Sequence, residues 1–211
     1  MLLALWYDTT MYSMEPDGTT LLLVRHAETT WNSQRRYAGH SEVPLSPDAD
    51  QQIAQLTQRL AHESIQAIYS SPLSRCIATI YPTAEVHGLS INLELGLRER
   101  NLGQWEGVTE TEIRQNHPQF TFPISAYDGE YAVPEGETLD ALAFRTHTVL
   151  QRIAERQAGR NTLVATHAGI IWMVLTRIVT NSPEVLDWPH NTTILRLSYH
   201  DTEFRLLDAE L

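Results

Sequence analysis

The sequence predicts an α/β protein, a three-layer sandwich in which a mostly parallel central sheet is flanked by helices. Short β-rich runs alternate along the chain with helical patterns, as they do in sheets whose parallel strands are joined by crossover helices. The run TTLLLVRH (19–26) is continuously apolar before its polar end, which is typical of a strand buried on both faces. No internal repeat appears, so these alternating units belong to one fold.

The first third of the chain contains an extension, a strand and a helix. Residues 1–18 are interpreted as an N-terminal extension without function, and 19–211 as a single domain. Within that domain 19–26 is the expected central strand. Ser46 and the residues after it favour a helix start, and apolar residues recur at helical spacing behind it, so a helix is expected over about 47–62.

The middle of the chain continues the alternation and then interrupts it. A strand is expected at 67–71, followed by a helix that starts near Pro72 and ends at Gly88. SINLE (90–94) predicts another strand. The acidic, aromatic stretch at about 100–137 is then interpreted as a lid-like insertion, with only a short helix expected near 109–116.

The last third returns to regular elements. Helix signals run from Thr138 to about Arg156 and are followed by a strand at 161–167. AGIIWMVLTRIVT, directly after that strand, predicts a helix that is apolar nearly all round and therefore buried. TTILRLSY and EFRLLDAEL are expected to form the two final strands.

The charge balance excludes some partners. The formal net charge is −11, which argues against nucleic acid as a partner, because such binding requires an excess of basic groups. All 15 basic residues are arginine, so an anion must be held by guanidinium groups, histidines or backbone N–H groups. No run is long enough to span a membrane, so no membrane association is expected. The lone cysteine, Cys76, is expected to be a buried apolar residue and favours a cytoplasmic location.

Two segments end in the same way. TLLLVRHAE and NTLVATHAG each run from an apolar strand into a histidine and a small residue, placing His26 and His167 at strand ends. Taken singly, either histidine is more often structural than functional. Because ligands bind outside the carboxyl ends of the strands in open α/β sheets, the repeated context instead predicts two histidines that face one crevice.

Several blocks of sequence carry a closer resemblance, in the order VRHAETTWN, AGHSEVPLS, SSPLSRC, LRERNLGQWEG, PEGET and THAG. Over about residues 19–200 the chain resembles the histidine phosphatase superfamily, in its phosphoglycerate-mutase-like branch. The resemblance implies a phosphatase that uses neither metal nor cofactor and acts through a phosphohistidine on a small phosphorylated metabolite. It also permits a homo-oligomer.

The resemblance assigns roles to particular residues. His26 would accept the phosphoryl group and Glu99 would move the proton. The residues that would bind the phosphoryl group or the substrate are Arg25, Asn32, Ala38, Gly39, Arg75, Glu99, His167 and Ala168.

The physical chemistry of these residue types agrees with those roles. Phosphoryl transfer requires an aligned nucleophile and preorganised positive groups, which Arg25 and Arg75 would supply without a metal. The same arginines disfavour the imidazolium form of His26 and so keep its ring nucleophilic. The other branch of the superfamily carries an aspartate as proton donor where Ala168 stands here, so we expect Glu99 to be the acid. Glu106 is the second choice.

Other interpretations remain open at this point. A cofactor-dependent phosphoglycerate mutase would return the phosphoryl group to the substrate, but the stretch LGQWEGVTETEIRQNHPQF is short and acidic where mutases are long and basic. A non-catalytic binding module on the same fold is a remote alternative. No carboxylate–histidine group has metal-ligand spacing, so no metal site is expected. Five aromatic residues in the insertion could line a substrate pocket or merely pack it: Trp105, Phe120, Phe122, Tyr127 and Tyr131.

Overall fold

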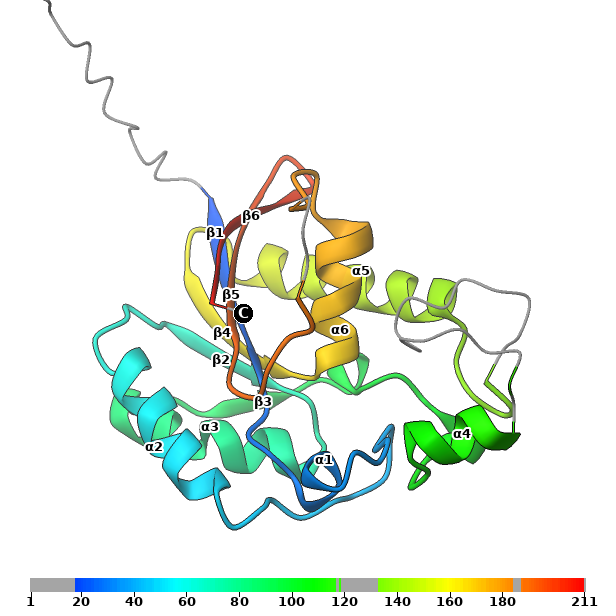
Figure 1. Cartoon of the computed structure of the whole chain (residues 1–211). Coiled ribbons are helices and arrows are strands. Elements are labelled where there is room, and N and C mark those ends of the chain that lie inside the picture. The colour runs from blue at the N-terminus through cyan, green and yellow to red at the C-terminus, as the bar shows by residue number, and fades with distance from the viewer. Residues whose placement is uncertain (1–17, 117, 119–132, 184–186, 211) are drawn as a thin grey trace, which may run out of the picture.

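The computed structural model describes residues 18–116, 118, 133–183 and 187–210. Its centre is a six-stranded sheet with the strand order β3-β2-β4-β1-β5-β6 (Figure 1). The strands are β1 (Thr19–Arg25), β2 (Ala67–Ser70), β3 (Ile91–Leu93), β4 (Asn161–Thr166), β5 (Ile194–His200) and β6 (Glu203–Glu210). The pairs from β3 to β1 are parallel and the last two pairs are antiparallel. The mostly parallel sheet is therefore confirmed.

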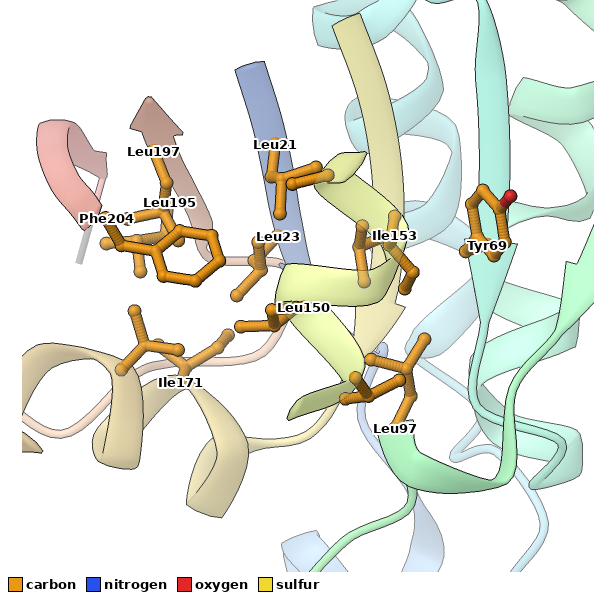
Figure 2. Close-up of a cluster of buried hydrophobic side chains, with 14 of the residues drawn as sticks. Leu21, Leu23, Tyr69, Leu97, Leu150, Ile153, Ile171, Leu195, Leu197 and Phe204 are labelled. Atoms are coloured by element: carbon orange, nitrogen blue, oxygen red, sulfur yellow. The ribbon is translucent and has the colours of Figure 1, made fainter. Parts of the chain in front are cut away.

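Helices cover both faces of the sheet, which confirms the three-layer arrangement (Figure 1). The helices that pack on the sheet are α2 (Ala49–Leu60), α3 (Ser74–His87), α5 (Leu139–Arg156) and α6 (Ala168–Met173). Alternate side chains of β1 point to opposite faces. Leu21 and Leu23 pack with residues of α5 and α6, as Figure 2 shows, whereas Leu22 and Val24 pack with α2 and α3. All four are buried, which explains why this strand is continuously apolar.

The ends of the helices follow local sequence signals. Thr138 caps α5, because its hydroxyl accepts a hydrogen bond from the N–H of Ala141 at 3.1 Å. Gly88 ends α3 in the left-handed conformation, with φ of 64°. The sequence predicted that Pro72 would lie in the first turn of α3. The helix instead begins at Ser74, so Pro72 lies just ahead of it.

Two short elements differ from expectation. The helix predicted after β4 is α-helical only as far as Met173 and continues as a π-helical turn, η4 (Val174–Ile178). The hydroxyl of Thr176 donates to the carbonyl of Trp172 at 2.7 Å, and the N–H of Val179 bonds to the carbonyl of Val174 five residues back. A one-turn helix, α1 (Thr30–Ser33), follows β1 and was not predicted, because four residues carry no hydrophobic period.

The region after β3 is largely irregular, with two 3₁₀ turns and one short helix. These are η1 (Leu95–Leu97), η2 (Gly103–Trp105) and α4 (Glu110–Asn116). The side chain of Trp105 is buried with Leu102, Ile113 and Val133, so it packs the base of this region. The remainder of the predicted insertion, including Phe120, Phe122, Tyr127 and Tyr131, lies outside the described residues, as does almost all of the N-terminal extension. In the part of the chain that the structure describes, no helix is both long and apolar enough to cross a bilayer.

Candidate active site

The two strand-end histidines lie together at the carboxyl edge of the sheet. His26 follows β1 and His167 follows β4, and these neighbouring parallel strands pair Arg25 with Thr166 at their ends. The ring centroids of His26 and His167 are 5.2 Å apart, with an interplanar angle of 63°. Both side chains are buried. The structure therefore brings both histidines to the same edge of the sheet.

A cavity of about 560 Å³ opens beside His26. Eight of the nine residues singled out in the sequence line it: Arg25, His26, Asn32, Ala38, Gly39, Arg75, Glu99 and Ala168. His167 is not among the lining residues, because its fully buried ring lies behind His26. The structure therefore brings the whole predicted set to one site, with His167 set back from the cavity wall.

The local structure fixes the ring of His26 through its inner nitrogen, Nδ1. Its Nδ1 lies 2.7 Å from the carbonyl oxygen of Ala27, and because a carbonyl can only accept, Nδ1 carries the proton. The Nε2 atom is then left with a free lone pair. Burial and the nearby charges of Arg25 and Arg75 hold the pKa of His26 well below its usual value, so the ring is neutral at pH 7. Thr79 fixes the turn by accepting the N–H of Ala27 at 2.8 Å.

Arg25 and Arg75 each donate hydrogen bonds to backbone carbonyl groups and have further N–H groups without a partner among the described residues. Arg25 donates from Nη1 to the carbonyl of Pro189 at 2.6 Å, and Arg75 donates to the carbonyls of Ser41 and Gly39, both at 2.8 Å. The Nε atoms of Arg25 and Arg75 are buried and have no hydrogen-bond partner within the described part of the chain. Burial lowers the pKa of Arg25 to about 10, which still leaves it charged at neutral pH. Both arginines line the cavity, so an anion there would lie against two guanidinium groups.

Asn32 is held by its oxygen atom, which leaves its amide N–H groups available. Its Oδ1 accepts the N–H of Thr29 at 3.0 Å, in the capping box that begins α1. Asn191 lies 3.5 Å from the same oxygen and donates to the carbonyl of His26 at 2.9 Å. Sequence reasoning missed Asn191, because the segment HNTT (190–193) matches no functional pattern. The one available signal was its place before β5, the strand that pairs with β1.

His167 contacts two side chains that lie deeper than the cavity. Its Nε2 lies 2.8 Å from the hydroxyl of Ser71 and 3.4 Å from the sulfur of Cys76. Burial, followed by the charge of Arg75, keeps the pKa of His167 well below its usual value. Burial also raises the pKa of Cys76 to about 12, so this thiol is protonated and unreactive at neutral pH, as the sequence suggested. Ser71 was not recognised from the sequence.

The two candidate acids occupy different places. Glu99 lines the cavity, and its carboxylate is oriented by the N–H of Arg100 at 2.8 Å and the N–H of Gly169 at 3.1 Å. Glu106 does not line the cavity. Its carboxylate accepts the N–H of His40 at 2.7 Å and a hydroxyl from the same loop. Geometry therefore selects Glu99 over Glu106 as the group that can reach a bound ester.

The outer part of the cavity is aromatic and apolar on one side. Trp172 and Trp188 line it with ring centroids 5.3 Å apart, next to Leu139 and Leu142. Sequence reasoning did not single out either tryptophan, because Trp172 lies in the apolar segment that was read only as a buried helix. Among the described residues, no group of three or more histidine, cysteine or acidic side chains is arranged to hold a metal ion.

The fold and this site together define a class of protein, an α/β enzyme whose site places two buried arginines beside a neutral histidine. Residues 21–210 match the family described as histidine phosphatase superfamily (branch 1). The chain belongs to this family.

Individual relatives agree with that assignment. The chain is 35% identical over 201 residues to phosphoglycerate mutase-like protein 4 of Arabidopsis thaliana, covering 94% of this chain and 84% of that protein. It is 31% identical to a metal-independent phosphoserine phosphatase of the same plant, covering 80% and 72%. The solved structure of Bacillus stearothermophilus YhfR superposes with a TM-score of 0.79 at 28% identity, covering 91% of this chain and 96% of that one. The chain is a phosphatase of this family.

Proposed function

We propose that the protein is a metal-independent phosphomonoester hydrolase that acts through a phosphohistidine on His26. The observation that carries the proposal is the arrangement around His26: a neutral ring with a free Nε2, flanked by two buried guanidinium groups that each hold an unused Nε–H. The substrate is a small phosphorylated metabolite, since the cavity measures about 560 Å³. We place the enzyme in the cytoplasm, with Cys76, its one cysteine, buried and free.

In the first half of the reaction, Nε2 of His26 attacks the phosphorus atom and the bond from phosphorus to the ester oxygen breaks. Arg25 and Arg75 hold the equatorial oxygens and offset their charge as it spreads in the transition state. The leaving oxygen takes its proton from the carboxyl group of Glu99, so an alcohol departs and Glu99 becomes a carboxylate.

In the second half, water attacks the phosphorus of the phosphohistidine and the nitrogen–phosphorus bond breaks. Glu99 takes the proton that this water loses, which restores its carboxyl group and releases inorganic phosphate. The hydrogen bonds to Glu99 from Arg100 and Gly169 keep the carboxylate at the same place for both proton transfers. The cycle needs no cofactor, because His26 and Glu99 end as they began.

The segment that follows Glu99 supports hydrolysis over transfer back to the substrate. It contributes Glu110 and Thr111 to the lining, and Glu112 lies beside them in α4. Apart from Arg100, which donates to the carbonyl of Glu137, the described residues that this segment adds to the lining are acidic or neutral, so they do not form the basic stretch with which a mutase retains the released phosphoglycerate.

The test combines a variant with direct detection of the intermediate. His26→Ala is expected to abolish phosphate release while the thermal unfolding midpoint stays close to that of the wild type. Mass spectrometry after rapid quenching is expected to find one phosphoryl group on the wild-type peptide that contains His26. Phosphate release by His26→Ala, or a phosphoryl group on another residue, would contradict the mechanism.

The mutase alternative is tested with the same protein. 3-Phosphoglycerate, with and without a bisphosphate primer, is scored for inorganic phosphate and for the 2-phospho isomer. We expect phosphate as the product in both cases. Isomer formation that depends on the primer would identify a mutase.

A further inference from the structure

Arg35 occupies a backbone position that normally belongs to glycine. It directly follows the last turn of α1 and has a φ of 55°. The N–H of Arg35 bonds to the carbonyl of Asn32 at 2.9 Å, and the N–H of Arg36 bonds to the carbonyl of Trp31 at 2.8 Å. These two bonds are those of a Schellman motif, whose left-handed residue is usually glycine because any side chain there adds strain. An arginine at this position therefore strains the backbone and lowers the stability of the fold, unless contacts of its side chain compensate.

Among the described residues, no side-chain contact compensates for that strain. The side chain of Arg35 is exposed, and its guanidinium group makes no hydrogen bond or ion pair with any residue that the structure describes. Its neighbours on the cavity wall are different: Arg36 donates to the carbonyl of Gly107 at 2.7 Å, and Arg100 donates to the carbonyl of Glu137 at 2.8 Å. Arg35 nevertheless lines the cavity that contains His26.

The backbone around Arg35 is held in place. Arg36 and Thr109 form an antiparallel bridge, and the N–H of Tyr37 bonds to the carbonyl of Val108 at 3.0 Å. This register places Glu110 beside Arg35, yet the carboxylate of Glu110 pairs with Arg114 one turn further along α4. Arg35 is thus a guanidinium group with a free set of donors at a fixed point of the cavity mouth, on a protein whose net charge is −11.

We propose that Arg35 is a specificity-determining residue that binds a second anionic group of the substrate, at the end of the molecule away from the phosphoryl group. A guanidinium group forms paired hydrogen bonds with either a carboxylate or a phosphate, so the substrate class is a phosphomonoester that carries one of these groups as well. This inference rests on the proposed function, because it takes the phosphoryl group to be held at His26.

The experiment compares two esters with the same three-carbon skeleton. 3-Phosphoglycerate carries a carboxylate where glycerol 3-phosphate carries a neutral hydroxymethyl group. In Arg35→Gly we expect KM for 3-phosphoglycerate to rise about fivefold, the upper end for a solvent-exposed ion pair. KM for glycerol 3-phosphate is expected to change less than twofold, and kcat for both esters is expected to stay within twofold. Arg35→Lys keeps the charge and should give an intermediate KM for 3-phosphoglycerate.

The thermal midpoint of Arg35→Gly is a second readout. If Arg35 had a structural role, this midpoint would fall. Glycine relieves the left-handed strain, so the thermal midpoint of Arg35→Gly is expected to stay unchanged or to rise by up to about 4 °C. Arg205→Gln, a change of equal charge on β6 outside the cavity lining, controls for the loss of one positive charge and should leave both KM values unchanged.

Three results would overturn the inference: equal changes in KM for the two esters, an equal rise of KM in Arg205→Gln, or a lower midpoint for Arg35→Gly. Failure of the proposed function looks different, because wild-type protein would then release phosphate from neither ester.

Discussion

Adding one methyl group at Gly169 is expected to lower the rate of catalysis without lowering the stability of the fold. A Cβ atom built on Gly169 would lie 2.2 Å from Oε1 of Glu99, whereas ordinary contacts begin at 3.4 Å. The carboxylate would therefore have to retreat by about 1.2 Å. Gly169 itself lies in the first turn of α6 without a positive φ, so alanine suits its backbone. The substitution Gly169→Ala displaces the proposed acid and leaves the fold intact.

The expected loss follows from that displacement. A misplacement of about 1 Å in a catalytic group can cost on the order of 100-fold in rate, so we expect kcat for glycerol 3-phosphate to fall by roughly that factor. Aryl esters such as 4-nitrophenyl phosphate leave without full protonation, and their first step should slow far less. Alanine in a helix is favoured over glycine by about 0.5–1 kcal/mol, so the thermal midpoint should not fall.

The assay measures kcat for a series of esters whose leaving groups span a wide range of acidity, together with thermal unfolding. Gly18→Ala is the matched control, because its nearest atom, the carbonyl oxygen of Tyr199, lies 3.9 Å from the added carbon. A double variant with Glu99→Gln should lose little more than either single variant, since both act through the same carboxylate. The reasoning is refuted if Gly169→Ala slows all leaving groups equally, or if the two losses multiply.

Three further predictions concern protonation, the acid and metals. Burial keeps His26 and His167 neutral in the folded state, whereas the unfolded chain takes up protons on them below about pH 6.5. The stability due to their depressed pKa values is therefore complete above that pH and is lost as the pH falls, by up to about 1.4 kcal/mol per pH unit for each histidine. Denaturant midpoints at pH 7 and pH 5 should differ less in a His26→Asn, His167→Asn double variant, and an unchanged difference would count against this origin. Glu106→Gln should lower the thermal midpoint while kcat for esters with poor leaving groups stays close to that of the wild type, because Glu106 accepts bonds from the loop at His40 and does not line the cavity. A loss of kcat confined to esters with poor leaving groups would instead make Glu106 the acid. Phosphate release should survive prolonged dialysis against a strong chelator, and activity restored only by added metal would exclude the metal-free mechanism.

The strands and longer helices were predictable because their signals are local. The continuous apolar run of β1, the helical spacing in α2 and the caps at Thr138 and Gly88 all act within one or two turns of the chain. The elements that escaped prediction are those where a local pattern is too short or is overridden. The four residues of α1 carry no period, and the hydroxyl of Thr176 competes with the backbone ladder where α6 becomes a π turn.

The site divides in the same way. His26 and His167 stand out in the sequence because each repeats the same strand-to-histidine context, and the structure brings their rings to 5.2 Å. Ser71, Thr79 and Asn191 orient the site through single hydrogen bonds, and such bonds leave no pattern in the sequence because any polar residue at the right point of the fold could form them. These residues can be recognised only from the folded structure, because each bonds to a residue that is distant in the sequence.

The position of β4 between β1 and β2 has a consequence for synthesis of the protein. The ribosome completes β1 and β2 long before β4, and these two strands pair with β4 and not with each other, so they lack their shared neighbour until residues 161–166 leave the exit tunnel. Asn191, which binds the carbonyl of His26, emerges later still. Contacts between segments so far apart form late and slowly in folding. We therefore expect chains truncated before β4 to release no phosphate, because the strand that carries His167 and the loop that carries Asn191 are missing from them.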